Sequence, residues 1–174
     1  MRIKIIVEGK SDEIFLKALI RKLNLRYINI EISGGKNKCE ITKPKTIKKI
    51  IENAQEDGYE KIIIVIDKVT QFHCGIINSS CLLDVKKEYI NKVLKNLKAD
   101  VIVVDEEIEC WYILAEKVNS YNQNCYSEVK KLFHSTSQQQ LAQRAVRKLD
   151  IILENKKKNR SFIYFLEKIK EGNK

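Results

Sequence analysis

The chain has 174 residues, of which 44% are hydrophobic and 32% charged, and its formal net charge is +10 at pH 7. This length favours one domain with a core of its own, and since no run of about 18 apolar residues occurs, we expect no membrane span. The amino terminus begins directly with a strand pattern and lacks the features of a signal peptide, which predicts a cytoplasmic protein.

The first elements in chain order are a strand, a helix and a second strand. Residues 2–7 form a short β-branched run, and residues 12–23 are apolar at helical spacing, with Ser11 in position to cap the helix. Residues 27–32 alternate as a strand does, and residues 33–36, which include two glycines, predict a turn.

The middle of the chain continues the alternation of helix and strand. Residues 46–55 follow Pro44 and place their apolar side chains on one helical face. Residues 61–66 form the most apolar strand, which we expect at the centre of a sheet. Residues 69–83 have mixed character and predict a long loop, and residues 84–97 predict a helix.

The last third adds one strand and is otherwise helical. Residues 100–104 predict a buried strand, and Asp105 is placed to cap a helix that runs to about residue 118. Two apolar stripes at helical spacing follow, separated by the basic segment 155–160. Their members are Leu141, Ala145, Leu149 and Ile152, and then Phe162, Phe165, Leu166 and Ile169.

This order of elements predicts an α/β fold. Alternating helices and buried strands imply a parallel sheet of about four strands with helices on both faces. We expect an α/β domain over residues 1–118 and a helical, basic extension over residues 119–174 packed on the same domain. The extension carries most of the net charge, because residues 126–174 include 12 basic and 5 acidic residues, against 21 and 18 in residues 1–125.

The five cysteines include no C-x-x-C pair, and in a cytosolic chain we expect them to be reduced. They are Cys39, Cys74, Cys81, Cys110 and Cys125. A zinc site built on His73, Cys74 and Cys81 would lack both a standard spacing and an evident fourth ligand, so incidental thiols are the favoured interpretation.

Three of the predicted strands end in an acid, namely Glu8, Asp67 and Asp105. The carboxyl ends of parallel strands meet at one edge of a sheet, where open α/β sheets bind their ligands. Like charges held together cost free energy unless a cation neutralises them. The pattern therefore predicts a carboxylate cluster with a bound divalent cation.

Three motifs in this order resemble the Toprim domain. They are the Val7-Glu8-Gly9-x-x-Asp12 start, the apolar strand that ends at Asp67, and the Glu109-Cys110-Trp111 segment. The Toprim domain is shared by topoisomerases, bacterial primases and the overcoming-lysogenization-defect (OLD) nucleases. The chain is most similar to small stand-alone Toprim-like proteins of that nuclease branch, over roughly residues 1–117. The resemblance implies a Rossmann-like, Toprim-like sheet.

The resemblance also implies roles for individual residues. Glu8 matches the glutamate that acts as general acid/base or metal ligand. Asp67 matches the first acid of the metal-binding D-x-D motif, whose second acid is replaced here by Val69. Asp12 matches an acid that nuclease members use for a second metal, and Glu109 matches the glutamate of the later segment. The implied cofactor is Mg²⁺ or Mn²⁺.

Elementary chemistry agrees with these roles. Mg²⁺ prefers oxygen ligands and is usually held by one or two carboxylates together with substrate phosphates, and Glu107 or Glu109 could join the set. Such an ion assists phosphodiester cleavage. Lys10 or Lys68 could steady the phosphate, and Trp111 could raise the pKa of a neighbouring carboxyl group.

Each residue also has a structural alternative. Asp12 suits the first turn of a helix, and Asp105 suits a helix cap. Trp111 and Tyr112 suit the core. Glu8 and Asp67 are the hardest to explain structurally, because each interrupts an apolar run.

The basic carboxyl-terminal segment suggests a nucleic-acid partner, although a solvated surface explains it equally well. The predicted contact residues are Arg144, Arg147, Lys148, Lys156, Lys157, Lys158 and Arg160.

Three functions are compatible with these patterns. The first is a metal-dependent nuclease, or related phosphoryl-transfer enzyme, acting on DNA or RNA. The second is a catalytically degenerate Toprim-like module that only binds nucleic acid, which the valine at position 69 favours. The third is an accessory protein that docks on a partner such as an ATPase.

Overall fold

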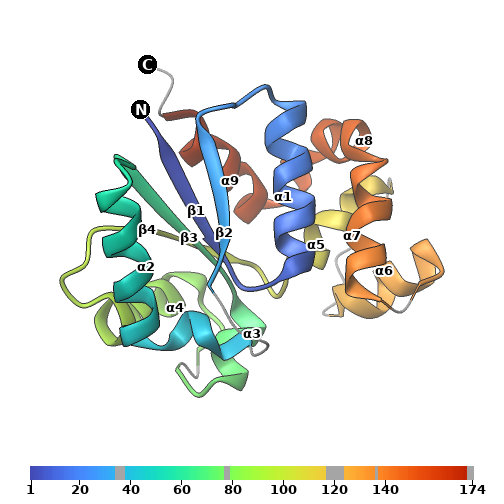
Figure 1. Cartoon of the computed structure of the whole chain (residues 1–174). Helices are drawn as coiled ribbons and strands as arrows, with labels where there is room; N and C mark the ends of the chain where they lie inside the picture. The colour runs from blue at the N-terminus through green and yellow to red at the C-terminus, as the bar shows by residue number, and fades with distance from the viewer. Residues whose placement is uncertain (34–37, 77–78, 117–123, 136, 172–174) are drawn as a thin grey trace.

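A parallel β-sheet of four strands forms the centre of the protein in the computed structural model (Figure 1). The structure describes residues 1–33, 38–76, 79–116, 124–135 and 137–171. The strand order is β2-β1-β3-β4, and every neighbouring pair is parallel. The strands are β1 (Ile3–Val7), β2 (Ile28–Ile32), β3 (Lys61–Asp67) and β4 (Asp100–Val104). The predicted α/β fold is confirmed.

The central strand β3 supplies side chains to two cores, one on each face of the sheet. Ile63 and Val65 pack in the first core, and Ile64 and Ile66 pack in the second. Because helices cover both faces, the strand needs apolar residues at consecutive positions, which explains its continuous hydrophobic run. The acid Asp67 breaks that run only at the carboxyl edge.

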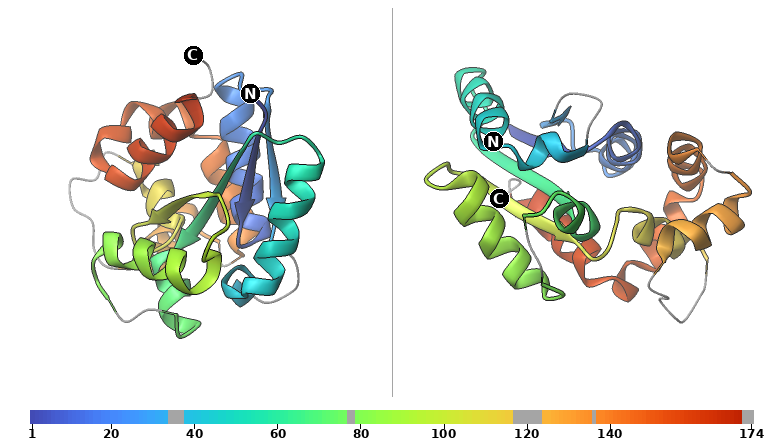
Figure 2. Two further views of the ribbon diagram at one scale, coloured as in Figure 1. Left: turned by 90° about the vertical axis from the view of Figure 1, so that its left-hand side faces the viewer. Right: turned by 90° about the horizontal axis from the view of Figure 1, so that it is seen from below.

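Helices cover both faces of the sheet (Figure 2). One face carries α2 (Pro44–Glu56), α4 (Leu82–Tyr89) and the π-helical turn η2 (Ile90–Leu94). The other face carries α1 and the helices that follow β4. They are α1 (Lys10–Lys22), α5 (Glu109–Tyr112), η3 (Ile113–Ala115), α6 (Cys125–Phe133), α7 (Gln138–Val146), α8 (Leu149–Glu154) and α9 (Arg160–Lys170), with the short turn η4 (Lys156–Lys158) before α9.

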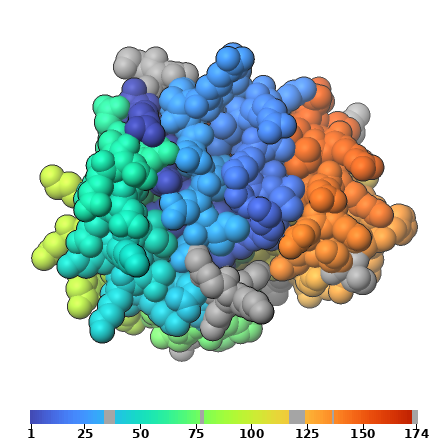
Figure 3. All heavy atoms as spheres, in the orientation of Figure 1, coloured from blue at the N-terminus to red at the C-terminus, as the bar shows by residue number. Residues whose placement is uncertain are grey.

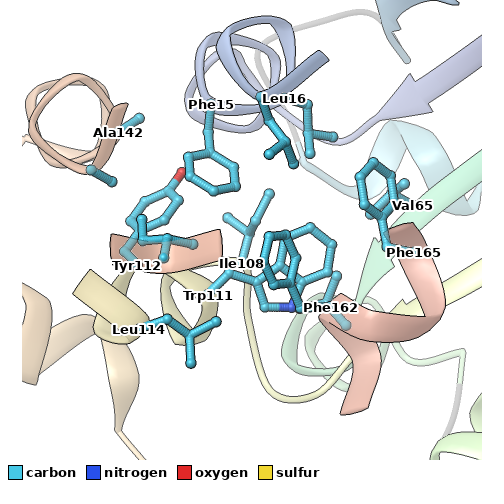
Figure 4. Packing of buried hydrophobic residues seen from close by; sticks show 14 of the residues in the cluster. Phe15, Leu16, Val65, Ile108, Trp111, Tyr112, Leu114, Ala142, Phe162 and Phe165 are labelled. Atoms are coloured by element: carbon cyan, nitrogen blue, oxygen red, sulfur yellow. The ribbon is translucent and has the colours of Figure 1, made fainter. Parts of the chain in front are cut away.

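The carboxyl-terminal helices share one core with α1. Trp111 packs against Phe162 and Phe165 of α9, with ring centroids 5.0 and 5.2 Å apart (Figure 4). Phe15 of α1 lies 4.8 Å from the ring of Tyr112. All five rings are fully buried. Trp111 and Tyr112 are therefore core residues that fix the short helix α5 beneath α1.

Two local predictions after β3 and β4 are wrong. Helix α3 (Lys68–His73) occupies part of the predicted loop over residues 69–83. It is too short for a helical period to show in the sequence. Asp105 does not cap a helix, because the next residue, Glu106, has φ +61° and leaves the helical region, and the helix begins only at Glu109.

The structure also corrects the expectation of reduced thiols. Cys39 and Cys74 form one disulfide, and Cys110 and Cys125 form another, with Cα atoms 5.7 and 5.0 Å apart. Cys81 is free and exposed. The fold brings together cysteines that are 35 and 15 residues apart, and spacing along the sequence cannot reveal such pairs. The disulfides also remove the zinc alternative.

The face shown in Figure 3 has β2 and α1 at its middle, between α2 on one side and the carboxyl-terminal helices on the other. Within the described ranges, no helix combines the length and apolar character that crossing a bilayer requires. Except for Ser33, the predicted turn over residues 33–36 lies outside the described residues.

Candidate active site

The residues that end β1 and β3 meet at a topological switch point of the sheet. From β1 the chain crosses one face through α1 to β2, and then crosses the other face through α2 to β3 on the opposite side of β1. Ligands of open α/β sheets bind at the carboxyl ends of the strands at such a point. Glu8 directly follows β1, and Asp67 ends β3, so the fold brings both to this crevice.

Glu8 is joined to the end of β3 by a hydrogen bond. The backbone N–H of Asp67 donates to Glu8 Oε1 at 2.8 Å, and both residues are only 5% exposed. Burial raises the pKa of Tyr89, and the negative charge of Glu8 raises it further. The Tyr89 hydroxyl donates to the carbonyl of Ile41 at 2.6 Å. The Glu8 carboxylate is therefore held in a dry, closely packed environment.

Asp12 organises the turn between β1 and α1. Its Oδ2 accepts from the backbone N–H of Gly9 at 3.0 Å, and its Oδ1 accepts from Ser11 Oγ at 3.1 Å. These bonds satisfy donors at the start of α1, which is the structural role expected of a first-turn acid. The side chain is also buried, so it lies in the interior rather than in solvent.

Tyr112 lies among three of the predicted acids. Burial raises the pKa of its hydroxyl well above the ordinary value, and the charges of Glu109, Asp12 and Asp67 raise it further. The carboxylates of α5, α1 and β3 are thus all near enough to Tyr112 for their charges to act on its hydroxyl. The hydroxyl has no hydrogen-bond partner among the described residues. Sequence reasoning assigned Tyr112 to the core, although its position one helical turn after Glu109 is a signal of proximity.

Glu107 and Glu109, the two candidate glutamates after β4, take different positions. Glu109 is 1% exposed and accepts a long hydrogen bond, 3.4 Å, from Gln138 Nε2 at the start of α7. Glu107 accepts from the backbone N–H of Tyr126 at 2.7 Å and so ties this loop to α6. Glu109 is one of the acids whose charge acts on Tyr112, whereas the hydrogen bond between Glu107 and Tyr126 has a structural role. No sequence signal pointed to Gln138.

Both candidate lysines have acidic partners. Lys10 is paired with Glu13, which also binds Lys17. Lys68 binds Glu106 and lies 3.5 Å from Asp105. Burial by itself lowers the pKa of Lys68. The hydrogen bond to Glu106 and the attraction of both carboxylates outweigh the effect of burial, so the net pKa is raised. Each lysine is thus a charged group beside the acidic edge, already partly neutralised.

The predicted basic residues fall at two ends of the protein. Lys22, at the end of α1, binds Asp150 of α8 at 2.7 Å, so the junction between α7 and α8 lies near the opposite edge of the sheet from the acids. Arg144, Arg147 and Lys148 belong to that junction.

The turn 156–160 lies closer to the acidic edge. Ser161, next to Arg160, accepts a hydrogen bond from the backbone N–H of Asp105 at 3.3 Å, which places the start of α9 at the end of β4. Lys156, Lys157, Lys158 and Arg160 are exposed there. The structure therefore separates the basic residues into two groups.

The donor chemistry of the acidic edge suits a hard divalent cation, since Glu8, Asp12, Asp67 and Glu109 are all carboxylates. The described part of the chain holds no group of three or more His, Cys, Asp or Glu side chains that could bind a metal ion. The edge instead suits an ion held by one or two carboxylates, with water and substrate phosphate as the other ligands.

Fold and site define a protein of the α/β class, with a Rossmann-like parallel sheet and buried carboxylates at its switch point. Comparisons with protein-family models, with curated proteins and with solved structures found no match to this chain.

Proposed function

We propose that the protein is a divalent-cation-dependent enzyme that hydrolyses phosphodiester bonds in nucleic acid, through a Toprim-type acidic site. The observation that supports this most is the position of Glu8 and Asp67, which are buried side by side at the switch point of the sheet. Buried acids cost free energy, so a position between two central strands needs a functional reason.

In this proposal Glu8 and Asp67 hold the cation, and water and substrate phosphate supply its other ligands. The ion, Mg²⁺ or Mn²⁺, would polarise a phosphoryl oxygen and activate water. The chain itself excludes bulk water through Tyr112 and Tyr89, which are fully buried beside these acids. Lys10, about half exposed at the start of α1, supplies positive charge near the incoming phosphate.

The basic turn 156–160 supports a polyanionic substrate. Its cations are exposed, and its neighbour Ser161 contacts the end of β4. A polyanion that reaches from this turn to the acidic edge would neutralise the turn and release bound counterions. The substrate class that fits is therefore DNA or RNA.

The test is cleavage of labelled DNA and RNA with Mg²⁺ or Mn²⁺. Glu8→Gln and Asp67→Asn should each lower the rate at least about 100-fold, because removing one stabilising group at a reacting centre has this effect. Asp100→Asn is the matched control, since Asp100 is an acid at the amino end of β4, on the opposite edge. If wild type cuts neither substrate, or if both site variants cut normally, the enzyme proposal fails.

A second candidate is a module that binds nucleic acid without cleaving it. Val69 stands where a second carboxylate would be needed, and both oxygens of Asp12 serve the turn before α1. This function predicts binding that weakens steeply with salt and needs no metal. It is excluded if titration at low salt in EDTA shows no binding.

A further inference from the structure

A pocket of about 350 Å³ lies beside the candidate active site. It is formed by the start of α3, the segment before α4 and the loop after β4. Its lining residues are Lys68, Val69, Phe72, Ser79, Ser80 and Glu106. Since Lys68 directly follows Asp67, the pocket opens next to the acid that ends β3.

The apolar wall of the pocket is an aromatic ring turned toward solvent. Phe72 is 61% exposed, although Thr70 and Gln71 in the same short helix are buried. Its ring meets the ring of His73 edge to face, with centroids 6.2 Å apart. An exposed ring on a pocket wall is a platform on which a flat heterocycle can stack.

The two charged groups that line the pocket, Lys68 and Glu106, balance each other. Lys68 is the pocket's ammonium group, and it is paired with Glu106 and Asp105. The carbonyl of Glu106 accepts from the backbone N–H of Val69 at 3.1 Å, which holds Glu106 in its left-handed conformation, φ +61°. Because the Lys68 ammonium is already paired with carboxylates, the pocket wall has no surplus positive charge to attract a phosphate, and the Glu106 carboxylate favours a neutral group with N–H donors.

We propose that this pocket binds one unpaired nucleobase, and that the substrate is therefore single-stranded nucleic acid or an unpaired end. The base stacks on Phe72, its N–H groups face the Glu106 carboxylate, and Ser79 and Ser80 offer hydroxyl groups to its edge. A base inside a duplex is already stacked on its neighbours and cannot enter. The inference rests on the proposed nucleic-acid function, and it assigns that function a substrate class.

The experiment measures binding of a labelled single strand in EDTA, so that no cleavage is needed. Phe72→Ala should raise Kd about 5- to 150-fold, the loss expected for one base–aromatic contact. Phe72→Leu should weaken binding as Phe72→Ala does, because it also removes the aromatic ring. Phe72→Tyr keeps the ring and should bind as wild type does. Leu83→Ala is the matched control, because Leu83 is 57% exposed on α4 and does not line the pocket.

Two other ligands make the test specific. A strand of the same length with abasic sugars keeps the phosphates but has no bases, so Phe72→Ala should leave its Kd unchanged. A fully paired duplex should likewise bind wild type and Phe72→Ala equally. Circular dichroism and thermal unfolding confirm that each variant is folded, which we expect since the ring is mostly exposed.

Each outcome decides between the proposals. If the strand binds wild type but Phe72→Ala loses nothing, or loses as much with the abasic strand, the pocket does not bind a base and the inference is overturned, while the acidic site is unaffected. If wild type binds no single strand and no duplex at low salt, the proposed function fails together with the inference.

Discussion

The disulfide between Cys110 and Cys125 can be tested by its effect on stability. It joins α5, which carries Glu109 and Tyr112, to the first residue of α6 across a separation of 15 residues. Chain-entropy arithmetic assigns a closed loop of this size about 3 kcal/mol of stabilisation. The separation of 35 residues between Cys39 and Cys74 corresponds to about 4 kcal/mol.

A domain of this size has about 5–15 kcal/mol of total stability, so either loss is a large fraction of it. The double variant Cys110→Ala/Cys125→Ala should therefore unfold at a clearly lower urea concentration than wild type under oxidising conditions. In excess dithiothreitol the two proteins should unfold at nearly the same concentration. Cys81→Ala is the control, because Cys81 is exposed and unbonded.

Thiol counting gives an independent check. Alkylation of the native oxidised protein, followed by mass spectrometry, should label Cys81 and leave the other four cysteines unlabelled. The reasoning is refuted if the double variant and wild type unfold at the same urea concentration without reductant. It is also refuted if all five thiols are alkylated before unfolding.

Two further predictions concern buried polar groups. Tyr112→Phe removes a buried hydroxyl that has no hydrogen-bond partner among the described residues, so it should stabilise the protein by about 1 kcal/mol in urea unfolding; destabilisation of that size would mean that the hydroxyl is bonded to a carboxylate or to water. Burial alone raises the pKa of Glu13, but hydrogen bonds from Lys10 and Lys17 outweigh it, so the net pKa falls below 4.5. A carboxyl group whose pKa is lower in the folded state stabilises that state at pH values above its pKa in the unfolded state. This stabilisation is lost as the pH falls through the pKa of the folded state. Glu13→Gln should therefore lower the free energy of unfolding by about 0.5–1 kcal/mol at pH 7 and by almost nothing at a pH low enough to protonate Glu13 in both states, as pH-dependent urea unfolding would show; an equal cost at both pH values contradicts the ion-pair explanation.

The sequence by itself determined the sheet and the acids at its edge. A strand buried on both faces must be apolar at consecutive residues, so the runs before Glu8 and Asp67 predicted central parallel strands. In such a sheet the carboxyl ends share one edge, and the two acids had to lie there. Both conclusions follow from patterns within a few residues, which is the range over which a sequence can be interpreted directly.

Only the tertiary structure decided how the other groups lie relative to that edge. Tyr112 lies near three acids, and Phe72 is exposed beside Lys68. Arg144 lies toward the amino-terminal edge of the sheet, opposite the acids. The fold also joins Cys110 to Cys125. Apart from the helical spacing of Glu109 and Tyr112, these relations depend on how separate helices pack. Packing is set by contacts between residues far apart in the chain, for which neither periodicity nor spacing carries a signal.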